Sequence, residues 1–133
     1  MSPHEIVTAP GLAEPVGFAH AVVAAPGRTV YLGGQTAQGP DGAIVGASMA
    51  EQFDQAAGNV VTALAAAGGT PEHLVSLIIY TTAVAGYRAA LKELGPLWRK
   101  HFGRHYPAVA LLGVAELFDE AAKIELVGTA VIP

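Results

Sequence analysis

Residues 48–82 read SMAEQFDQAAGNVVTALAAAGGTPEHLVSLIIYTT, and the change of period inside this segment decides the fold class. Ser48 is followed three residues later by Glu51, the spacing of a capping box at the start of a helix. Gly68-Gly69 ends this helix, and the β-branched residues of 75–82 predict a strand after it. Between the two ends, apolar residues recur every three or four positions, which predicts one buried helical face: Phe53, Ala56, Ala57, Val60, Leu64 and Ala67.

The chain before this segment predicts a β-meander. Proline and glycine indicate turns or strand ends within it at Pro26-Gly27, Gly33-Gly34 and Pro40-Asp41-Gly42. Two successive glycines at a strand end also allow the backbone to approach another group closely. The strand-like stretches between these turns cover 4–8, 18–25, 29–32, 35–38 and 43–45.

The chain after this segment predicts one more helix and two more strands. The helix covers 86–102, with a kink or boundary near Gly95 because Pro96 lies inside it. The strands cover 107–115 and 122–132. The whole order predicts an α+β fold, a mixed sheet with two helices packed on one face. Since the last strand is apolar on both sides, we expect a neighbouring subunit to bury the other face.

Size and composition set further bounds. The 133 residues are enough for a single domain spanning 1–133, and 52% of them are hydrophobic against 14% charged. The longest unbroken apolar runs, 63–67 and 108–112, fall far short of the roughly 20 residues of a membrane span, so no membrane partner is expected. Residues 1–10 lack the apolar stretch of a secretory signal. We therefore expect a cytoplasmic protein.

Charge and cysteine content exclude several kinds of site. There is no cysteine, which excludes disulfides, thiolate metal sites and a cysteine nucleophile. The formal net charge is −4. Nucleic-acid binding needs a basic face, and the basic residues gather only around 99–105, so a nucleic-acid partner is unlikely. A small-molecule ligand is the better expectation.

Several short sequence words, in a fixed order along about residues 18–131, resemble the Rid/YjgF (reactive-intermediate deaminase) superfamily. The words are residues 30–35 (VYLGGQ), Glu51, Gln52, Asn59 and Leu64 in the helix, 66–68 (AAG), Phe102-Gly103, Pro107-Ala108 and 123–125 (KIE). The resemblance implies a chorismate-mutase-like fold and a homotrimer with three small-molecule clefts between subunits. It also implies that neither a metal nor an organic cofactor is needed.

The resemblance assigns roles to particular positions. In deaminating members an arginine after the Pro-Ala word binds the substrate carboxylate, and a glutamate on the final strand positions or activates water. Glu125 matches that glutamate and is the candidate catalytic residue. Gly34 and Gln35 match backbone positions that complete the substrate-binding site.

Four other substrate-binding positions depart from the family pattern. Val109 occupies the arginine position, and Leu111 occupies a position that is usually small or cysteine. Phe18 replaces a frequent tyrosine, and Gly33 replaces a frequent serine. A carboxylate would lose its partner and its hydration against such an apolar floor, so the substrate is expected to be larger or less acidic than the usual ones.

Three residues are site candidates on their own chemistry. His20 lies two residues after Phe18, so within a strand both side chains would share a face and His20 could act as acid or base. Glu116 belongs to an acidic loop before the last strand, and Tyr106 adjoins the Pro-Ala word. A structural histidine and a solvated loop are the alternatives for the first two.

Two further groups of side chains have a structural alternative as well. Tyr87 and Trp98 have the spacing of core residues on a helix, although they too could line an aromatic pocket. His101 and His105 have the spacing of a metal-binding pair, but Gly103 interrupts the helix between them and no third ligand is apparent, so no metal site is expected.

The sequence leaves three functions open. The first is an enzyme that hydrolyses or deaminates an imine or enamine, with Glu125 acting on water. The alternative is a trimeric ligand-binding protein without turnover. The third, an RNA-cleaving translation inhibitor, is disfavoured by the acidic charge.

Overall fold

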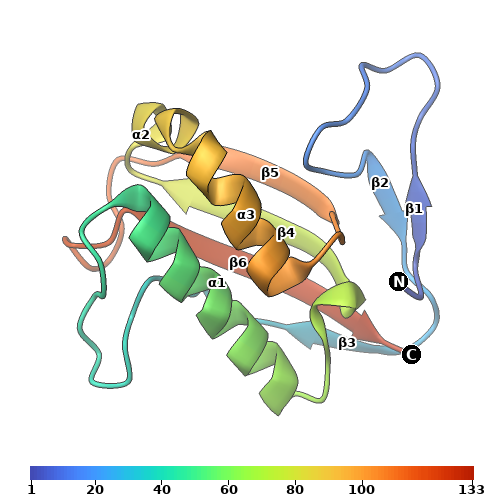
Figure 1. Cartoon of the computed structure of the whole chain (residues 1–133). Coiled ribbons are helices and arrows are strands. Elements are labelled where there is room, and N and C mark those ends of the chain that lie inside the picture. Colours follow the sequence, from blue (N-terminus) through green and yellow to red (C-terminus); the bar gives the residue numbers. More distant parts are fainter.

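The computed structural model describes all residues, 1–133, and contains two sheets and three α-helices (Figure 1). Its elements in chain order are β1 (Glu5–Val7), β2 (Ala21–Val23), β3 (Arg28–Tyr31), α1 (Met49–Ala66), the 3-10 turn η1 (Pro71–His73), β4 (Leu74–Thr81), α2 (Val84–Ala89), α3 (Leu91–Phe102), β5 (Ala108–Gly113) and β6 (Ile124–Ile132). Both predicted helices and the predicted strands of residues 48–132 are therefore present, and the second helix is divided into α2 and α3.

The main sheet has the strand order β3-β6-β4-β5. Strand β4 runs parallel to β5 and antiparallel to β6, and β6 runs antiparallel to β3, which confirms a mixed sheet. Helices α1 and α3 lie side by side across one face of this sheet (Figure 1). The prediction of an α+β fold with its helices on one face is confirmed.

Helix α1 begins at the predicted capping box. The Ser48 hydroxyl accepts from the Glu51 N–H at 3.1 Å, and the Glu51 carboxylate accepts from the Ser48 N–H at 3.2 Å. These bonds satisfy two backbone donors that would otherwise lack partners at the helix start. The predicted apolar stripe is completely buried at five positions, Phe53, Ala56, Ala57, Val60 and Leu64, and packs on β4 and β6. The sixth predicted position, Ala67, is exposed because it caps the end of the helix. This layer is the core of the protein.

The predicted helix over 86–102 is divided at a different place from the one expected. The break lies at Ala90, which separates α2 from α3, whereas Pro96 lies inside α3. The proline is tolerated because its side chain faces solvent, and the carbonyl that loses its bond belongs to Lys92, which is also exposed. The boundary predicted near Gly95 was wrong.

The predicted N-terminal meander was also wrong. Strands β1 and β2 pair only with each other and stand apart from the main sheet (Figure 1). Residues 35–38 and 43–45 form one isolated bridge, Gln38 to Ile44, around the predicted turn. At Gly27 the chain passes so close to the end of β6 that a Cβ would come within 2.3 Å of the Ile132 carbonyl oxygen. The residues that follow pair with β6 as β3 and not with β2.

The face of the main sheet opposite the helices has no cover within the chain. Its side chains include Tyr31, which is 81% exposed, and Leu112, which is 47% exposed. Between these edges lie the half-buried Ile78, Tyr80 and Val127. We refer to this surface as the open face. No helix in the chain has the length and apolar character that crossing a membrane requires.

Candidate functional site

An apolar cleft of about 650 Å³ opens between α3, the edge strand β5 and the loop before β2. Val109 and Leu111 of β5 line this cleft. The positive φ of Gly17, 79°, turns the chain so that Phe18 reaches the rim. Its lining contains no charged side chain and consists of Val16, Gly17, Phe18, Phe53, Ile79, Tyr87, Leu91, Leu94, Gly95, Trp98, Tyr106, Val109 and Leu111.

Aromatic rings form one wall of this cleft. The rings of Trp98 and Tyr106 stack with centroids 5.4 Å apart and planes 4° apart, and Trp98 stacks on Phe53 from the other side at 6.4 Å. The Trp98 Nε1–H donates to the His105 carbonyl at 3.1 Å, so its one polar atom is satisfied. Tyr106 therefore lines the cleft. Tyr87 and Trp98 fit both of the roles considered for them, because they pack on the core and also line the cleft.

Glu125 lies on the other side of the sheet, on the open face. Its neighbours in β6, Ile124 and Leu126, are buried under the helices, so the alternation of the strand turns Glu125 away from them. Tyr80 is its partner on β4. Within one chain, Glu125 and the Val109 side of the cleft are therefore separated by the sheet.

Gly34 packs directly against the Glu125 carboxylate. A Cβ on Gly34 would lie 2.5 Å from Glu125 Oε2, so the close approach predicted for the double glycine occurs at its second member. The Gln35 N–H donates to the Leu126 carbonyl, and the Gln35 carbonyl accepts from the Leu126 N–H, both at 2.8 Å. Gly34 and Glu125 thus lie together on the open face, and we call them, with Gly33 and Gln35 that flank Gly34 in the chain, the Glu125 group.

Gln52 fixes the start of the strand that carries Glu125. Its buried side chain accepts from the Lys123 N–H at 2.8 Å and donates to the Ala121 carbonyl at 3.0 Å. Asn59, about two turns further along α1 and half-buried, donates to the Thr36 and Gln38 carbonyls at 3.0 and 2.8 Å. These two amides hold the loops on either side of the Glu125 group, which explains why the helix carries them.

His20 has a structural environment in this chain. The strand expected over 18–25 begins only at Ala21, but the rings of His20 and Phe18 still meet edge-on, with centroids 6.0 Å apart. His20 Nδ1 accepts from the Ala9 N–H at 2.9 Å, and Nε2 donates to the Ala13 carbonyl at 2.9 Å. Both ring nitrogens are thus used to fix the loop of 9–13. Glu116 is exposed on the loop after β5 and does not line the cleft.

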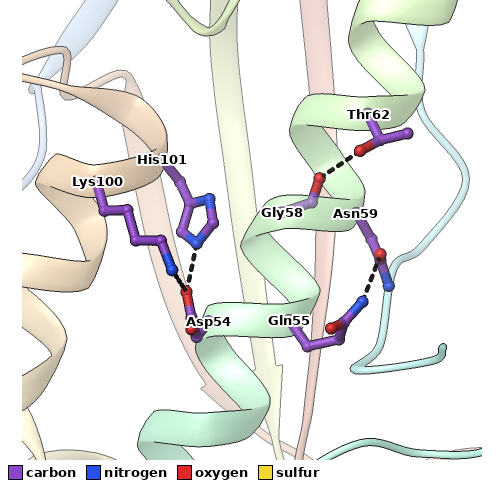
Figure 2. A network of polar contacts seen from close by, with 7 residues as sticks. All are labelled: Asp54, Gln55, Gly58, Asn59, Thr62, Lys100 and His101. Carbon is purple, nitrogen blue, oxygen red and sulfur yellow. Dashed lines mark hydrogen bonds and ion pairs between the residues drawn. The ribbon is translucent and has the colours of Figure 1, made fainter.

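His101 and His105 point to different partners. His101 Nε2 lies 2.6 Å from Asp54 Oδ1, and Lys100 Nζ donates to the same oxygen at 2.9 Å, so three side chains join α3 to α1 (Figure 2). His105 instead donates from Nε2 to the Leu74 carbonyl at 2.8 Å, since a carbonyl can only accept. Their separation of four residues therefore does not bring the two rings to one site.

These two interactions predict that acid destabilises the fold. Burial lowers the pKa of His105 from 6.5, so its contribution to stability is complete above that value and is lost as the pH falls below it. The hydrogen bonds from Lys100 and then His101 lower the pKa of Asp54 from 3.8, so that contribution is lost only in stronger acid. Melting temperatures are expected to fall from pH 7 to pH 5 and again below pH 4. His105→Gln, which keeps a donor but does not titrate, should flatten the first fall; an unchanged slope would contradict this assignment.

Comparison with known proteins identifies the family. Residues 11–132 match the family described as Endoribonuclease L-PSP. The chain belongs to this family. Its members are the Rid/YjgF proteins that the sequence words resemble, and they share its chorismate-mutase-like fold.

Individual family members show how far the likeness extends. The Rid-family protein YyfB from Yersinia pestis, whose function is described as unknown, is 28% identical, covers 97% of this chain and 98% of its own, and superposes with a TM-score of 0.87. Yeast Mmf1 is also 28% identical, with 95% of each chain covered, but has a TM-score of 0.66. The curated sequence Protein MMF1, mitochondrial, from Saccharomyces cerevisiae is 27% identical over 106 residues, which are 80% of this chain and 70% of the relative. At equal identity, the backbone therefore matches YyfB more fully than Mmf1.

Some residues that line this cleft were missed by sequence reasoning. Leu91 and Leu94 line it from α3, and Val16 and Gly17 line it from the loop before β2. The two leucines have the spacing of ordinary core residues on a helix, and the loop has no regular period that would mark it. The signal for the loop was Gly17, whose place before the aromatic Phe18 is compatible with a turn.

Proposed function

We propose that the protein binds a small molecule in clefts between subunits and hydrolyses an imine or enamine whose apolar part replaces the usual carboxylate. The observation that carries this proposal is the cleft beside β5, where Val109 occupies the position that the family resemblance gives to carboxylate recognition and Leu111 adds a second apolar side chain. Because no cationic side chain lines the cleft, a carboxylate there would be desolvated without a partner. The proposed substrate is therefore uncharged at this end.

The proposed site is composite. The Glu125 group and the apolar cleft lie on opposite faces of the sheet, so one copy would contribute the carboxylate and a neighbouring copy the cleft. The exposed apolar side chains of the open face, Tyr31 and Leu112, support an assembly that covers this face. The family resemblance makes that assembly a homotrimer. A cytoplasmic location, based on composition, remains part of the proposal; the yeast relative is named as mitochondrial.

The proposed reaction needs only water and a positioned carboxylate. Glu125 takes a proton from water as the water oxygen bonds to the imine carbon, and the C=N electron pair becomes a lone pair on nitrogen. The nitrogen receives that proton from Glu125, which gives a carbinolamine. The carbinolamine hydroxyl then loses its proton through Glu125 to the nitrogen, the C=O bond forms as the C–N bond breaks, and a ketone or aldehyde and ammonia are released. Water is consumed one for one, and no electron is transferred to another molecule.

Ammonia release tests the proposal directly. Imines are generated in situ from amines or amino acids of increasing apolar size, and the release of ammonia is followed with and without the protein. The enzyme is supported if imines without a carboxylate are hydrolysed faster than 2-iminopropionate. No acceleration with any imine would overturn catalysis and favour the non-catalytic ligand-binding protein.

Val109→Arg is expected to change the preferred substrate. A guanidinium in the cleft can bind a carboxylate through two charge-assisted hydrogen bonds, worth roughly tenfold or more in kcat/KM for 2-iminopropionate. Val109→Met, which adds length without charge, is the matched control and should give no gain. Light scattering on the same samples checks that both variants keep the wild-type assembly. A gain with methionine as large as with arginine would contradict the charge argument.

A further inference from the structure

The apolar cleft contains two side-chain hydroxyls that have no partner in the chain. Its polar side chains are Tyr87, Trp98 and Tyr106, and the Trp98 indole N–H is already bonded to the His105 carbonyl. No buried side-chain nitrogen or oxygen lacks a hydrogen bond, so the unpaired hydroxyls must remain accessible from the cleft or from solvent. The two tyrosines therefore differ in what surrounds their hydroxyls.

Tyr106 lies at the rim. It lines the apolar cleft and also a neighbouring hollow of about 340 Å³ that contains Arg104 and the ion pair between the N-terminus and Glu72. A rim hydroxyl shared between two hollows can be hydrated without a ligand. A ligand would therefore replace a hydrogen bond that water can already make with the Tyr106 hydroxyl.

Tyr87 lines the apolar cleft from α2 and does not line the neighbouring hollow. Its ring packs against the core cluster, and burial raises the pKa of its phenol above 10.0, so the group is neutral and protonated near neutral pH. A phenol donor surrounded by apolar side chains loses hydration that only a hydrogen-bond acceptor can replace. Neighbouring apolar groups offer it no such acceptor, since Val109, Leu111 and Leu91 line the same cleft.

We infer that Tyr87 is the specificity-determining residue of the cleft, donating a hydrogen bond to an uncharged acceptor on the ligand, a carbonyl oxygen or an imine nitrogen. The apolar part of that ligand lies against Trp98 and Val109. This inference rests on the proposed function for the identity of the cleft, but it concerns binding and does not require turnover. It assigns to a neutral donor on α2 the recognition that the family assigns to a cation at position 109.

Binding of three small aromatic probes tests this inference. Acetophenone carries a neutral acceptor, benzoate carries a charge, and chlorobenzene has no comparable acceptor. Trp98 is the only tryptophan in the chain and lines the cleft, so its single indole N–H resonance in a nitrogen-labelled sample reports occupancy. The wild type should bind acetophenone more tightly than benzoate.

Variants separate the hydrogen bond from general packing. Tyr87→Phe should weaken acetophenone roughly 3- to 10-fold, the net value of one hydrogen bond, and leave chlorobenzene unchanged. Tyr31→Phe removes the same hydroxyl from the open face and is the matched control. Unligated spectra show whether each variant keeps the wild-type fold.

Four outcomes would overturn the inference. They are tighter binding of benzoate than of acetophenone, equal weakening of acetophenone and chlorobenzene by Tyr87→Phe, weakening by Tyr106→Phe in place of Tyr87→Phe, and no response of the Trp98 resonance to any probe. Failure of ammonia release would leave this binding result standing. The two proposals can therefore fail separately.

Discussion

Glu125→Gln is expected to lower the rate of imine hydrolysis at least 100-fold while leaving the fold intact. A positioned acid or base contributes roughly 10²- to 10⁴-fold, and glutamine has nearly the same shape as glutamate but cannot take a proton from water. Glu125 makes no hydrogen bond that holds the fold together, since its carboxylate only packs against Gly34. The measurement is kcat for ammonia release, with melting temperature as a check on folding.

The matched control for this variant is Glu120→Gln. It makes the same chemical change on the exposed acidic loop before β6, away from the carboxylate that the proposal uses. Its kcat should equal that of the wild type. Retained activity in Glu125→Gln would remove Glu125 from the reaction and leave the cleft without an assigned base.

Phe102→Ala is expected to have the largest effect on stability, about 3–5 kcal/mol. Its ring is 1% exposed at the end of α3 and meets Trp98 edge-on, with centroids 4.7 Å apart. A loss of this size is a large part of the 5–15 kcal/mol that stabilises a typical protein, so the variant should unfold at much lower urea concentration. Urea titrations at one fixed protein concentration measure the difference.

Phe118→Ala is the comparison for Phe102→Ala. It removes the same ring from the loop after β5, where the side chain is fully exposed in the single chain. A change within about 0.5 kcal/mol is expected there. Equal losses in the two variants would contradict the assignment of Phe102 to the core.

The regular part of the fold was predictable because local signals agreed with the long-range packing. The Ser48–Glu51 capping box, the apolar stripe of α1 and the alternation of β6 each gave the correct element. The errors arose where a contact between residues far apart in the sequence determines where an element ends or which strand it pairs with. The break at Ala90 and the continuous helix at Pro96 depend on which side faces solvent, and β3 pairs with β6 and not with β2 where Gly27 passes close to Ile132.

The sequence indicated which residues belong to the candidate site, but not on which face of the sheet each of them lies. Val109, Leu111 and Tyr106 line one cleft, and Gly34 lies against Glu125. Their role in binding stays a prediction. What the sequence lacked was the register between β4, β5 and β6, which separates these two groups. His20 was misleading because its hydrogen bonds run to backbone groups of 9–13, which no spacing rule reveals.

The separation of the Glu125 group from the apolar cleft by a sheet has a genetic consequence. Under the proposed assembly, a chain with a defective carboxylate still offers an intact aromatic wall to its neighbour, and a chain with a defective wall still offers an intact carboxylate. Two inactive alleles with opposite defects would therefore complement each other in mixed oligomers. Two alleles that share the same defect would not.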